Sequence, residues 1–240
     1  APSLSLPAIV GTHVTPHPLH DGDAVILDGA RCVLLTGFDD ATLEEYRHRQ
    51  HQQQTRRGEL QRLKDKPAVT LDGTRIRLLA NLKNKKFLHN KKPLIGAMIE
   101  VPSVLAIIDD LAAEADFLSI GTNDFVQYML AADRGNYTVA DYYQPWHPAV
   151  LRGLARIAST AQQLGKDLSV CGELAHEIDY IPFLLGIGIR VFSIYPKFLP
   201  SIQKIVAKLE IKDVELYAGE LLGQPTIKGV REVLAKRKLN

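Results

Sequence analysis

Apolar and polar positions along the second half of this chain predict strands and helices in turn. Short runs typical of the buried strands of a parallel sheet occur at 75–80, 94–99, 117–120, 168–170 and 191–194. Apolar residues at helical spacing follow around 103–115, 124–130, 148–164, 201–209, 213–222 and 226–236. Strands and helices joined in this order by short turns indicate right-handed βαβ units, so we expect an α/β fold.

Proline and glycine mark the ends of several predicted helices. Pro148 suits the first position of a helix that ends at Gly165, with its expected buried residues Val150, Leu151, Leu154, Ile157, Ala158 and Leu164. A helix led by Pro102 and Ser103 is expected to place on one face Val104, Ile108, Leu111 and Ala115. Thr122 or Asn123 is expected to cap the helix after 117–120, leaving backbone N–H groups free to hold an anion.

The first part of the chain has a different pattern. Two apolar segments, 24–27 and 32–35, flank the turn signal at Asp28, which predicts a β-hairpin too small for a core of its own. Residues 41–66 are helical in pattern but polar nearly all round, which is typical of a helix that crosses solvent between domains. We interpret the irregularly spaced His13, His17 and His20 as loop histidines rather than metal ligands.

Composition narrows the class of protein. A chain of 240 residues with 46% hydrophobic and 23% charged residues can form one large domain, or one domain and part of another. A net charge of +2 gives no reason to expect a nucleic-acid or acidic membrane partner. No apolar run approaches the ~18 residues of a membrane span. Cys32 and Cys171 cannot form a disulfide framework, so a cytoplasmic location is expected.

Polar residues of catalytic type recur at the carboxyl ends of the predicted strands. Glu100 follows one strand, Asn123 and Asp124 follow the next, and Cys171 follows a third. In a β/α barrel these ends share one face, where active sites are built. Asp124 is a hard-oxygen ligand suited to Mg²⁺, and Arg134 can hold phosphate or carboxylate with two hydrogen bonds. A metal ligand, free backbone amides and an arginine together suit the binding of a phosphorylated acid.

Each of these residues taken alone has a simpler interpretation. Asn123 could be only a helix cap, Asp133 and Arg134 a surface pair, and Cys171 a small apolar core residue. The lysine-rich stretch at 83–92 is more simply a solvated loop than a binding patch. A sheet core needs no polar group at three successive strand ends. The recurrence therefore favours a functional site.

Several motifs resemble one enzyme family. The motifs are GAMIEVPS at 96–103, DFLSIGTND at 116–124, QYMLAADRGN at 127–136, HPAV at 147–150 and VCGELA at 170–175. In uninterrupted register they resemble phosphoenolpyruvate-protein phosphotransferase, which is enzyme I of the bacterial phosphotransferase system, in its sugar or nitrogen-related form. LPAIVGT at 6–12 and DGDAVILDG at 21–29 look like the tail of that family's swivelling phosphohistidine domain.

The resemblance implies a role for each candidate residue. Glu100 and Asp124 would hold Mg²⁺ against phosphoenolpyruvate, and Asn123 or the amides around it would bind the anionic end of the substrate. Arg134 would neutralise phosphate charge, and Cys171 would protonate the enolate as pyruvate forms. It further implies a phosphocarrier partner of the HPr type and a part in sugar transport. A homodimer is expected as well, because strand edges left open by the missing part of the fold can pair between two chains.

Two departures from the family's pattern predict a truncated and internally deleted member. The family's phosphorylated histidine lies upstream of the LPAIVGT motif, and three strand-helix units that carry phosphate-binding arginines are missing between 82 and 93. The retained strands are the first and the fifth to eighth of a (β/α)8 TIM-type barrel. Because the eighth strand of a closed barrel neighbours the first, we expect one contiguous arc with open edges at 75–80 and 94–99.

We therefore expect a remnant of the swivelling domain at 1–37, a connector helix at 38–69 and a partial phosphoenolpyruvate-binding barrel at 70–240. The expected function is phosphoryl transfer from phosphoenolpyruvate to a protein histidine, incomplete for turnover. One alternative is an inactive remnant that only binds or dimerises. Another is a Mg²⁺-dependent pyruvate aldolase or lyase, which would account for Glu100 and Asp124 but not for Cys171.

Overall fold

The computed structural model describes residues 20–28, 31, 33–61, 66–80 and 94–236. The chain forms two compact units, Ala1–Arg62 and Leu63–Asn240, and each is described here by itself. Within the described residues, no helix is both long enough and apolar enough to cross a membrane. The predicted domain boundaries at 37 and 69 stay predictions.

The first unit contains the predicted hairpin and the predicted polar helix. Strands β1 (Val25–Asp28) and β2 (Val33–Thr36) pair antiparallel, with Val25 opposite Thr36. Helix α1 (Asp40–Gln61) begins where the Asp39 carboxylate accepts a hydrogen bond from the N–H of Thr42, at 2.8 Å. His20 is exposed, whereas His13, His17 and Cys32 lie outside the described residues.

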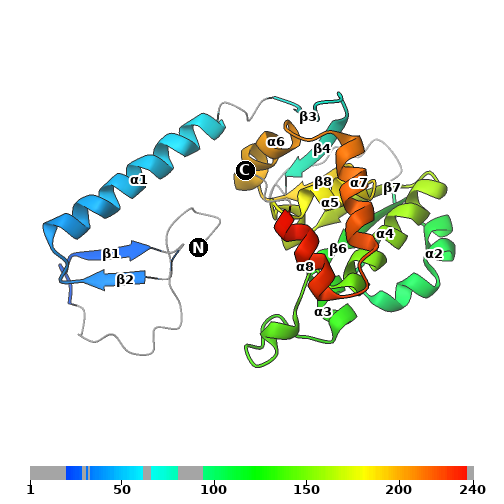
Figure 1. The fold of residues 1–240 in the computed structure, drawn as a ribbon, viewed down its shortest axis with the longest axis horizontal. Coiled ribbons are helices and arrows are strands. Elements are labelled where there is room, and N and C mark those ends of the chain that lie inside the picture. Colours follow the sequence, from blue (N-terminus) through cyan, green and yellow to red (C-terminus); the bar gives the residue numbers. More distant parts are fainter. Residues whose placement is uncertain (1–19, 29–30, 32, 62–65, 81–93, 237–240) are drawn as a thin grey trace. The chain divides into compact units, whose positions relative to one another are not determined.

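The second unit is built on a six-stranded sheet. Its strands are β3 (Ala68–Val69), β4 (Arg75–Ala80), β5 (Gly96–Ile99), β6 (Phe117–Gly121), β7 (Asp167–Cys171) and β8 (Val191–Ile194). The spatial order is β3-β4-β8-β7-β6-β5 (Figure 1). All neighbouring pairs are parallel except β3 with β4. The α/β class and the predicted neighbour order of the parallel strands are confirmed.

One of the two predicted open edges is partly covered. The short strand β3, which the sequence pattern did not predict, pairs with the start of β4, with Ala68 opposite Ile76. The other edge agrees with the expectation, because β5 is the outermost strand and Leu94 and Ile95 beside it are 71% and 72% exposed. The prediction of a fully open edge at β4 was therefore wrong over its first two residues.

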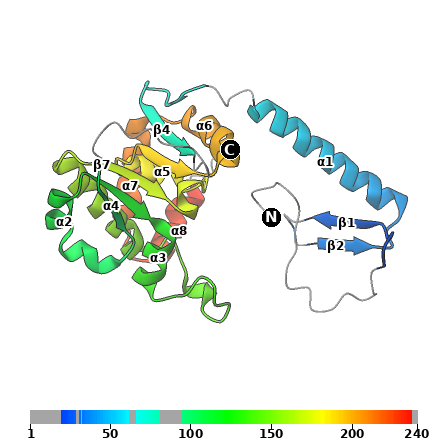
Figure 2. The ribbon, with the colours of Figure 1, turned by 180° about the vertical axis from the view of Figure 1, so that it is seen from behind.

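Helices cover one face of this sheet. They are α2 (Ile108–Glu114), α3 (Thr122–Leu130), α4 (Pro148–Gln163), α5 (Ile181–Gly186), α6 (Leu199–Val206), α7 (Ile211–Leu222) and α8 (Ile227–Lys236). Single-turn 3-10 helices lie at Pro102–Ala106, Ala140–Tyr142, Glu173–Ala175 and Pro196–Phe198. Figure 1 shows α7 and α8 in front of the sheet, and Figure 2 shows them behind it.

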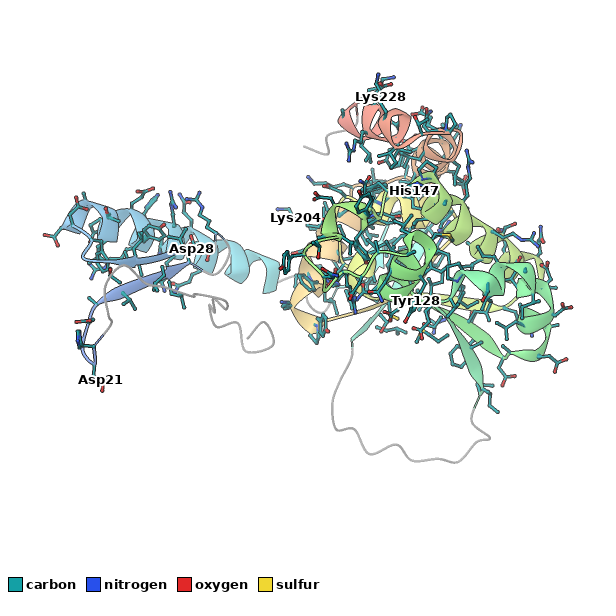
Figure 3. The ribbon with its side chains drawn as sticks, turned by 90° about the horizontal axis from the view of Figure 1, so that it is seen from below. Asp21, Asp28, Tyr128, His147, Lys204 and Lys228 are labelled. Atoms are coloured by element: carbon teal, nitrogen blue, oxygen red, sulfur yellow. The ribbon has the colours of Figure 1, made fainter. Side chains whose placement is uncertain are left out.

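Helix α4 shows how local sequence sets the ends of an element. His147, labelled in Figure 3, caps the helix through Nδ1, which accepts a hydrogen bond from the N–H of Ala149 at 3.1 Å. Pro148 takes the first helical position, and Gly165 ends the helix with φ of 61°. The predicted burial of Leu164 was wrong. It is 44% exposed, because it lies beyond the last helical residue and the chain turns there.

The hydrophobic core lies between the helices and alternate positions of the strands. The fully buried strand residues that face it include Ile99, Leu118, Ile120, Val170 and Phe192. The intervening positions of β6 and β7 are Ser119 and Ser169, whose hydroxyl groups hydrogen-bond at 3.0 Å, and then Gly121 and Cys171. Because side chains alternate along a strand, the candidate thiol lies on the face away from the core helices.

Candidate functional site

The predicted site residues come from the ends of three adjacent strands. Glu100 directly follows β5, Asn123 and Asp124 lie in the first turn of α3 after β6, and Cys171 is the last residue of β7. The register places Ile99 beside Ile120 and Gly121 beside Cys171. The structure therefore brings these four residues to one edge of the sheet, as parallel pairing requires.

Gly121 provides the space that Glu100 occupies. A Cβ atom at position 121 would lie 2.7 Å from Oε2 and 3.2 Å from Cβ of Glu100. Any side chain at this position would displace the carboxylate of Glu100. The absence of a side chain at Gly121 thus lets the end of β5 approach the end of β6.

Cys171 is a protonated thiol within electrostatic range of two carboxylates. Its Sγ lies 3.3 Å from the carbonyl oxygen of Ile120 and donates a hydrogen bond to it. Burial raises the pKa of the Cys171 thiol, a hydrogen bond with Ser119 lowers it, and the charges of Glu100 and Asp124 raise it again. The net effect is upward, so the thiol keeps its proton at neutral pH. The carboxylates of Glu100 and Asp124 therefore both lie within electrostatic range of the sulfur.

Neither Thr122 nor Asn123 caps α3, which corrects the prediction from sequence. The Thr122 hydroxyl donates to the carbonyl of Cys171 at 2.8 Å, and Oδ1 of Asn123 accepts from the N–H of Glu173 at 2.8 Å. Both side chains are used to connect α3 to the end of β7. Helix α3 has no side-chain cap, so its first N–H groups are available to an anion, as is Nδ2 of Asn123.

Gly172 makes this connection sterically feasible. Its φ is 91°, and a Cβ atom there would lie 2.4 Å from Oγ1 of Thr122 and 2.9 Å from Oδ1 of Asn123. Gly172→Ala is therefore expected to lower the free energy of unfolding by about 2–4 kcal/mol, combining backbone strain with overpacking. Urea unfolding followed by circular dichroism measures this loss.

Gly165→Ala is the matched control for this prediction. Gly165 has a similarly positive φ of 61°, but a Cβ atom there would have no neighbour within 4 Å. It should therefore report backbone strain alone, about 1–2 kcal/mol. Equal losses in the two variants would contradict the close approach of Gly172 to Thr122 and Asn123.

Arg134 and Tyr143 extend the site from the loop after α3. Arg134 is exposed, and its N–H donates to Oε1 of Gln127 at 3.3 Å. The Tyr143 hydroxyl lies 3.4 Å from the carbonyl oxygen of Asn123 and donates to it. Burial raises the pKa of Tyr143, with Glu173 and Asp124 adding to this and Arg134 opposing it. Arg134 and Asp124 therefore both lie within electrostatic range of one phenol ring.

Tyr143 was missed by reasoning from sequence. Its only signal was an aromatic run, DYYQPW at 141–146, in an otherwise polar segment. His176 was missed as well, and it stacks on Phe198 with ring centroids 4.0 Å apart. Burial lowers the pKa of His176, and Glu173 opposes this, so the ring is neutral at pH 7. The rings of His176 and Phe198 come together only because the segments that follow β7 and β8 pack against each other.

The site offers hard oxygen donors but no large ligand cluster. Among the described residues, no group of three or more His, Cys, Asp or Glu side chains is arranged to hold a metal ion. Glu100 and Asp124 come from adjacent strand ends, and both carboxylates lie within electrostatic range of one thiol. Mg²⁺ commonly takes one or two carboxylates and completes its shell with water and substrate oxygens, so this pair fits that ion.

Comparison with known families identifies the class of protein. A family model described as PEP-utilising enzyme, PEP-binding domain, matches residues 82–211, where PEP is phosphoenolpyruvate. This match covers more than half of the chain and includes all the candidate site residues. The chain belongs to this family of phosphoenolpyruvate-utilising enzymes.

Individual relatives narrow the family further. The chain is 39% identical to a "Phosphoenolpyruvate-protein phosphotransferase" of Bacillus subtilis over 136 residues, which are 57% of the chain and 24% of that protein. It is 38% identical over 144 residues to a Salmonella typhimurium protein named "Phosphoenolpyruvate-dependent phosphotransferase system", covering 60% of the chain and 19% of that protein. With "Multiphosphoryl transfer protein 1" of Escherichia coli it shares 41% identity over 132 residues, 55% of the chain and 16% of that protein.

These comparisons confirm the resemblance to phosphoenolpyruvate-protein phosphotransferase. They also limit what can be transferred, because the chain spans only about a quarter of these relatives or less. The segment at 82–93, where the sequence departs from the family's pattern, lies outside the described residues. The activity, substrates and partners of the whole relatives are therefore treated below as proposals for this chain.

Proposed function

We propose that this chain binds phosphoenolpyruvate at the strand-end site and serves phosphoryl transfer of the enzyme I type, from phosphoenolpyruvate to a protein histidine. The observation that carries the proposal is that Glu100, Asp124 and Cys171 lie at the ends of three adjacent parallel strands, with both carboxylates within electrostatic range of the thiol. The names of the relatives support it. A phosphocarrier protein of the HPr type would receive the phosphoryl group in turn.

Each residue has a role that follows from its chemistry. Glu100 and Asp124 would hold Mg²⁺, which when bound neutralises charge on the substrate's oxygens. The side-chain Nδ2 of Asn123 and the first N–H groups of α3 would bind the substrate carboxylate, since Oδ1 of Asn123 is already occupied by Glu173. Arg134 would neutralise phosphate charge during transfer.

Cys171 would supply the proton that completes pyruvate. When the bond between phosphorus and the enol oxygen breaks, its electron pair stays on that oxygen and the phosphoryl group passes to an imidazole nitrogen. The resulting enolate takes the Sγ proton of Cys171 at its methylene carbon, which gives the methyl group of pyruvate. The thiolate then regains a proton from water. A raised pKa keeps the proton on Cys171 until the enolate forms.

The same proposal extends to the fold and the assembly. The parallel strands β4, β8, β7, β6 and β5 would be an arc of a (β/α)8 barrel, and residues 1–37 would be a remnant of a swivelling phosphohistidine domain. None of the chain's histidines stands in the motif that this family phosphorylates, so these 240 residues by themselves would not complete turnover. The exposed apolar edge at β5 supports a homodimer, and a cytoplasmic location is proposed.

Alkylation of Cys171 tests substrate binding directly. Because burial raises its pKa, the rate of reaction with iodoacetamide should rise with pH through a midpoint above that of an ordinary thiol. Below this midpoint the protonated thiol reacts slowly, and above it the thiolate dominates. Phosphoenolpyruvate with Mg²⁺ should slow the alkylation about fivefold or more at saturation, which mass spectrometry of the labelled peptides measures.

Asp124→Asn is the control for this protection. The substitution removes one proposed Mg²⁺ ligand and keeps the size of the side chain, so ligand protection should disappear while Cys171 still reacts. Cys32 provides an internal reference, because the proposal places it outside the site. Protection that persists in Asp124→Asn, or that affects both cysteines equally, would contradict substrate binding at these strand ends.

A further inference from the structure

A cavity lies at the opposite end of the sheet from the strand-end site. It has a volume of about 640 Å³ and is lined by the starts of β7 and β8, including Asp167, Leu168 and Val191, and by residues of α4, α5 and α7. This volume falls within the range of sites for small molecules. Because β7 runs from Asp167 to Cys171, the cavity and the candidate active site lie at the two ends of one strand.

Two of the charged groups that line this cavity already have partners. The Nζ atom of Lys166 donates to the carbonyl oxygens of Ala113 at 3.3 Å and Ala115 at 2.8 Å. Asp167 forms an ion pair with Arg77 at 3.5 Å. These interactions engage two N–H groups of Lys166 and pair the carboxylate of Asp167, which reduces what both side chains can offer a ligand.

Arg190 and Glu215 are the other two charged residues that line the cavity. Nη1 of Arg190 donates to the carbonyl oxygens of Leu185 and Ile189, at 2.5 and 3.0 Å, and the described residues provide no further acceptor for Nε or Nη2. Glu215 is exposed and makes no ion pair within 4.0 Å in the described part of the chain. The guanidinium can still form two parallel hydrogen bonds to a carboxylate.

The two charges line the same cavity without forming an ion pair. Burial lowers the pKa of Arg190, and the negative charges of Glu215 and Asp72 raise it, so Glu215 lies within electrostatic range. In the described part of the chain, however, no side-chain nitrogen of Arg190 lies within 4.0 Å of a carboxylate oxygen of Glu215. A ligand that carries both a negative and a positive group can fit between them. A phosphate would be repelled by the carboxylate of Glu215, and a simple cation would be repelled by the guanidinium group of Arg190.

The rest of the lining is small and apolar. Residues without large side chains form part of the wall, namely Ala155, Ala158, Gly186, Ala218 and Gly219, and larger apolar groups come from Leu168, Ile187 and Leu222. Such a wall leaves room for an aliphatic side chain of moderate size and removes its surface from water. The cavity therefore combines a pair of opposite charges with an apolar compartment.

We propose that this cavity binds a free, zwitterionic α-amino acid with a branched apolar side chain. Arg190 receives its carboxylate through Nε and Nη2, Glu215 receives its ammonium group, and the aliphatic side chain lies against α4 and α7. This binding site is independent of the strand-end chemistry, and it stands whether or not the chain binds phosphoenolpyruvate.

Titration of the full chain with L-valine tests the proposal, using isothermal calorimetry or ligand-observed NMR. Two analogues separate the charges: isovalerate lacks the ammonium group, and isobutylamine lacks the carboxylate. Both should bind about tenfold or more weakly than valine, since each leaves one protein charge without its partner. Absence of valine binding at millimolar concentration, or equal binding of all three compounds, would overturn the proposal.

Two variants locate the binding. Glu215→Gln should reduce the affinity for valine about tenfold and leave that for isovalerate nearly unchanged. Gly219→Leu should abolish valine binding by filling the cavity, while Gly219→Ala retains it. A Cβ atom at Gly219 meets nothing within 4 Å, so Gly219→Ala is compatible with the fold, and circular dichroism checks that Gly219→Leu is folded. Valine binding that is unaffected by Glu215→Gln and Gly219→Leu would place the ligand elsewhere and reject this site.

Discussion

Cys171→Ser should lower the rate at which the protein exchanges the methyl protons of pyruvate with solvent by about 10²–10⁴-fold, the usual contribution of a positioned acid or base. The exchange is the reverse of the proposed protonation. The thiolate of Cys171 removes a methyl proton and the enolate forms, the new thiol exchanges this proton for a deuteron from solvent, and the enolate carbon takes the deuteron from the thiol. A serine hydroxyl at this position is far less acidic than a thiol, so it cannot serve at neutral pH. Proton NMR in deuterium oxide with Mg²⁺ follows the loss of the methyl signal.

Cys32→Ser is the matched control, because it removes the other cysteine and should leave the exchange rate unchanged. Phosphoenolpyruvate should still bind to Cys171→Ser, because the binding groups come from Glu100, Asn123 and Asp124. A reduced exchange rate together with intact binding would assign the proton to Cys171. An exchange rate that survives in Cys171→Ser would return this residue to a purely structural role.

Gly186→Ala is expected to destabilise the second unit by about 3 kcal/mol or more. Gly186 ends α5, and a Cβ atom there would lie 2.1 Å from the carbonyl oxygen of Val214 and 2.7 Å from Cβ of Ala218 on α7. Neither neighbour can rotate away, because one is backbone and the other is the first atom of its side chain. The helices must separate, which exceeds the usual cost of overpacking in a core.

Thermal unfolding measures this effect, and a loss of 3 kcal/mol corresponds to a decrease in Tm of about 6–12 °C for a unit of this size. Gly219→Ala, on the facing helix, is the control. Its Cβ has no neighbour within 4 Å, and alanine gains up to ~1 kcal/mol over glycine inside a helix. Similar melting temperatures for the two variants would contradict the close packing of α5 on α7.

The order of the strands and the location of the chemistry could be predicted because they depend on local patterns. Each apolar run that was predicted as a strand contains one, and parallel pairing places the polar residues Glu100, Asp124 and Cys171 that follow or end these strands at the same edge. The neighbour relation of β4 and β8 rested on the resemblance to a barrel, since periodicity within 75–80 carries no information about its partner. Helix α5 could not be assigned, because IPFLLG is apolar all round and too short to show a helical period.

The interactions within the site could not be predicted, because they join residues far apart in the sequence. Thr122 and Asn123 have the side chains of helix caps, and a cap is the local choice for both. In the folded chain the backbone at Cys171 and Glu173 offers each a partner about 50 positions away, at 2.8 Å in both cases. These contacts exist only because Gly172 lets the two loops approach.

The sequence by itself determined the alternation of strands and helices, and the residue types present at each strand end. These features could be predicted because the periodicity of side chains and the preferences of turns depend on residues only a few positions apart. Only the tertiary structure decided that Tyr143 contacts Asn123, that Cys171 has a raised pKa, and that Arg190 and Glu215 line one cavity. Burial and electrostatic potential depend on distances between distant segments, and no local pattern fixes those distances.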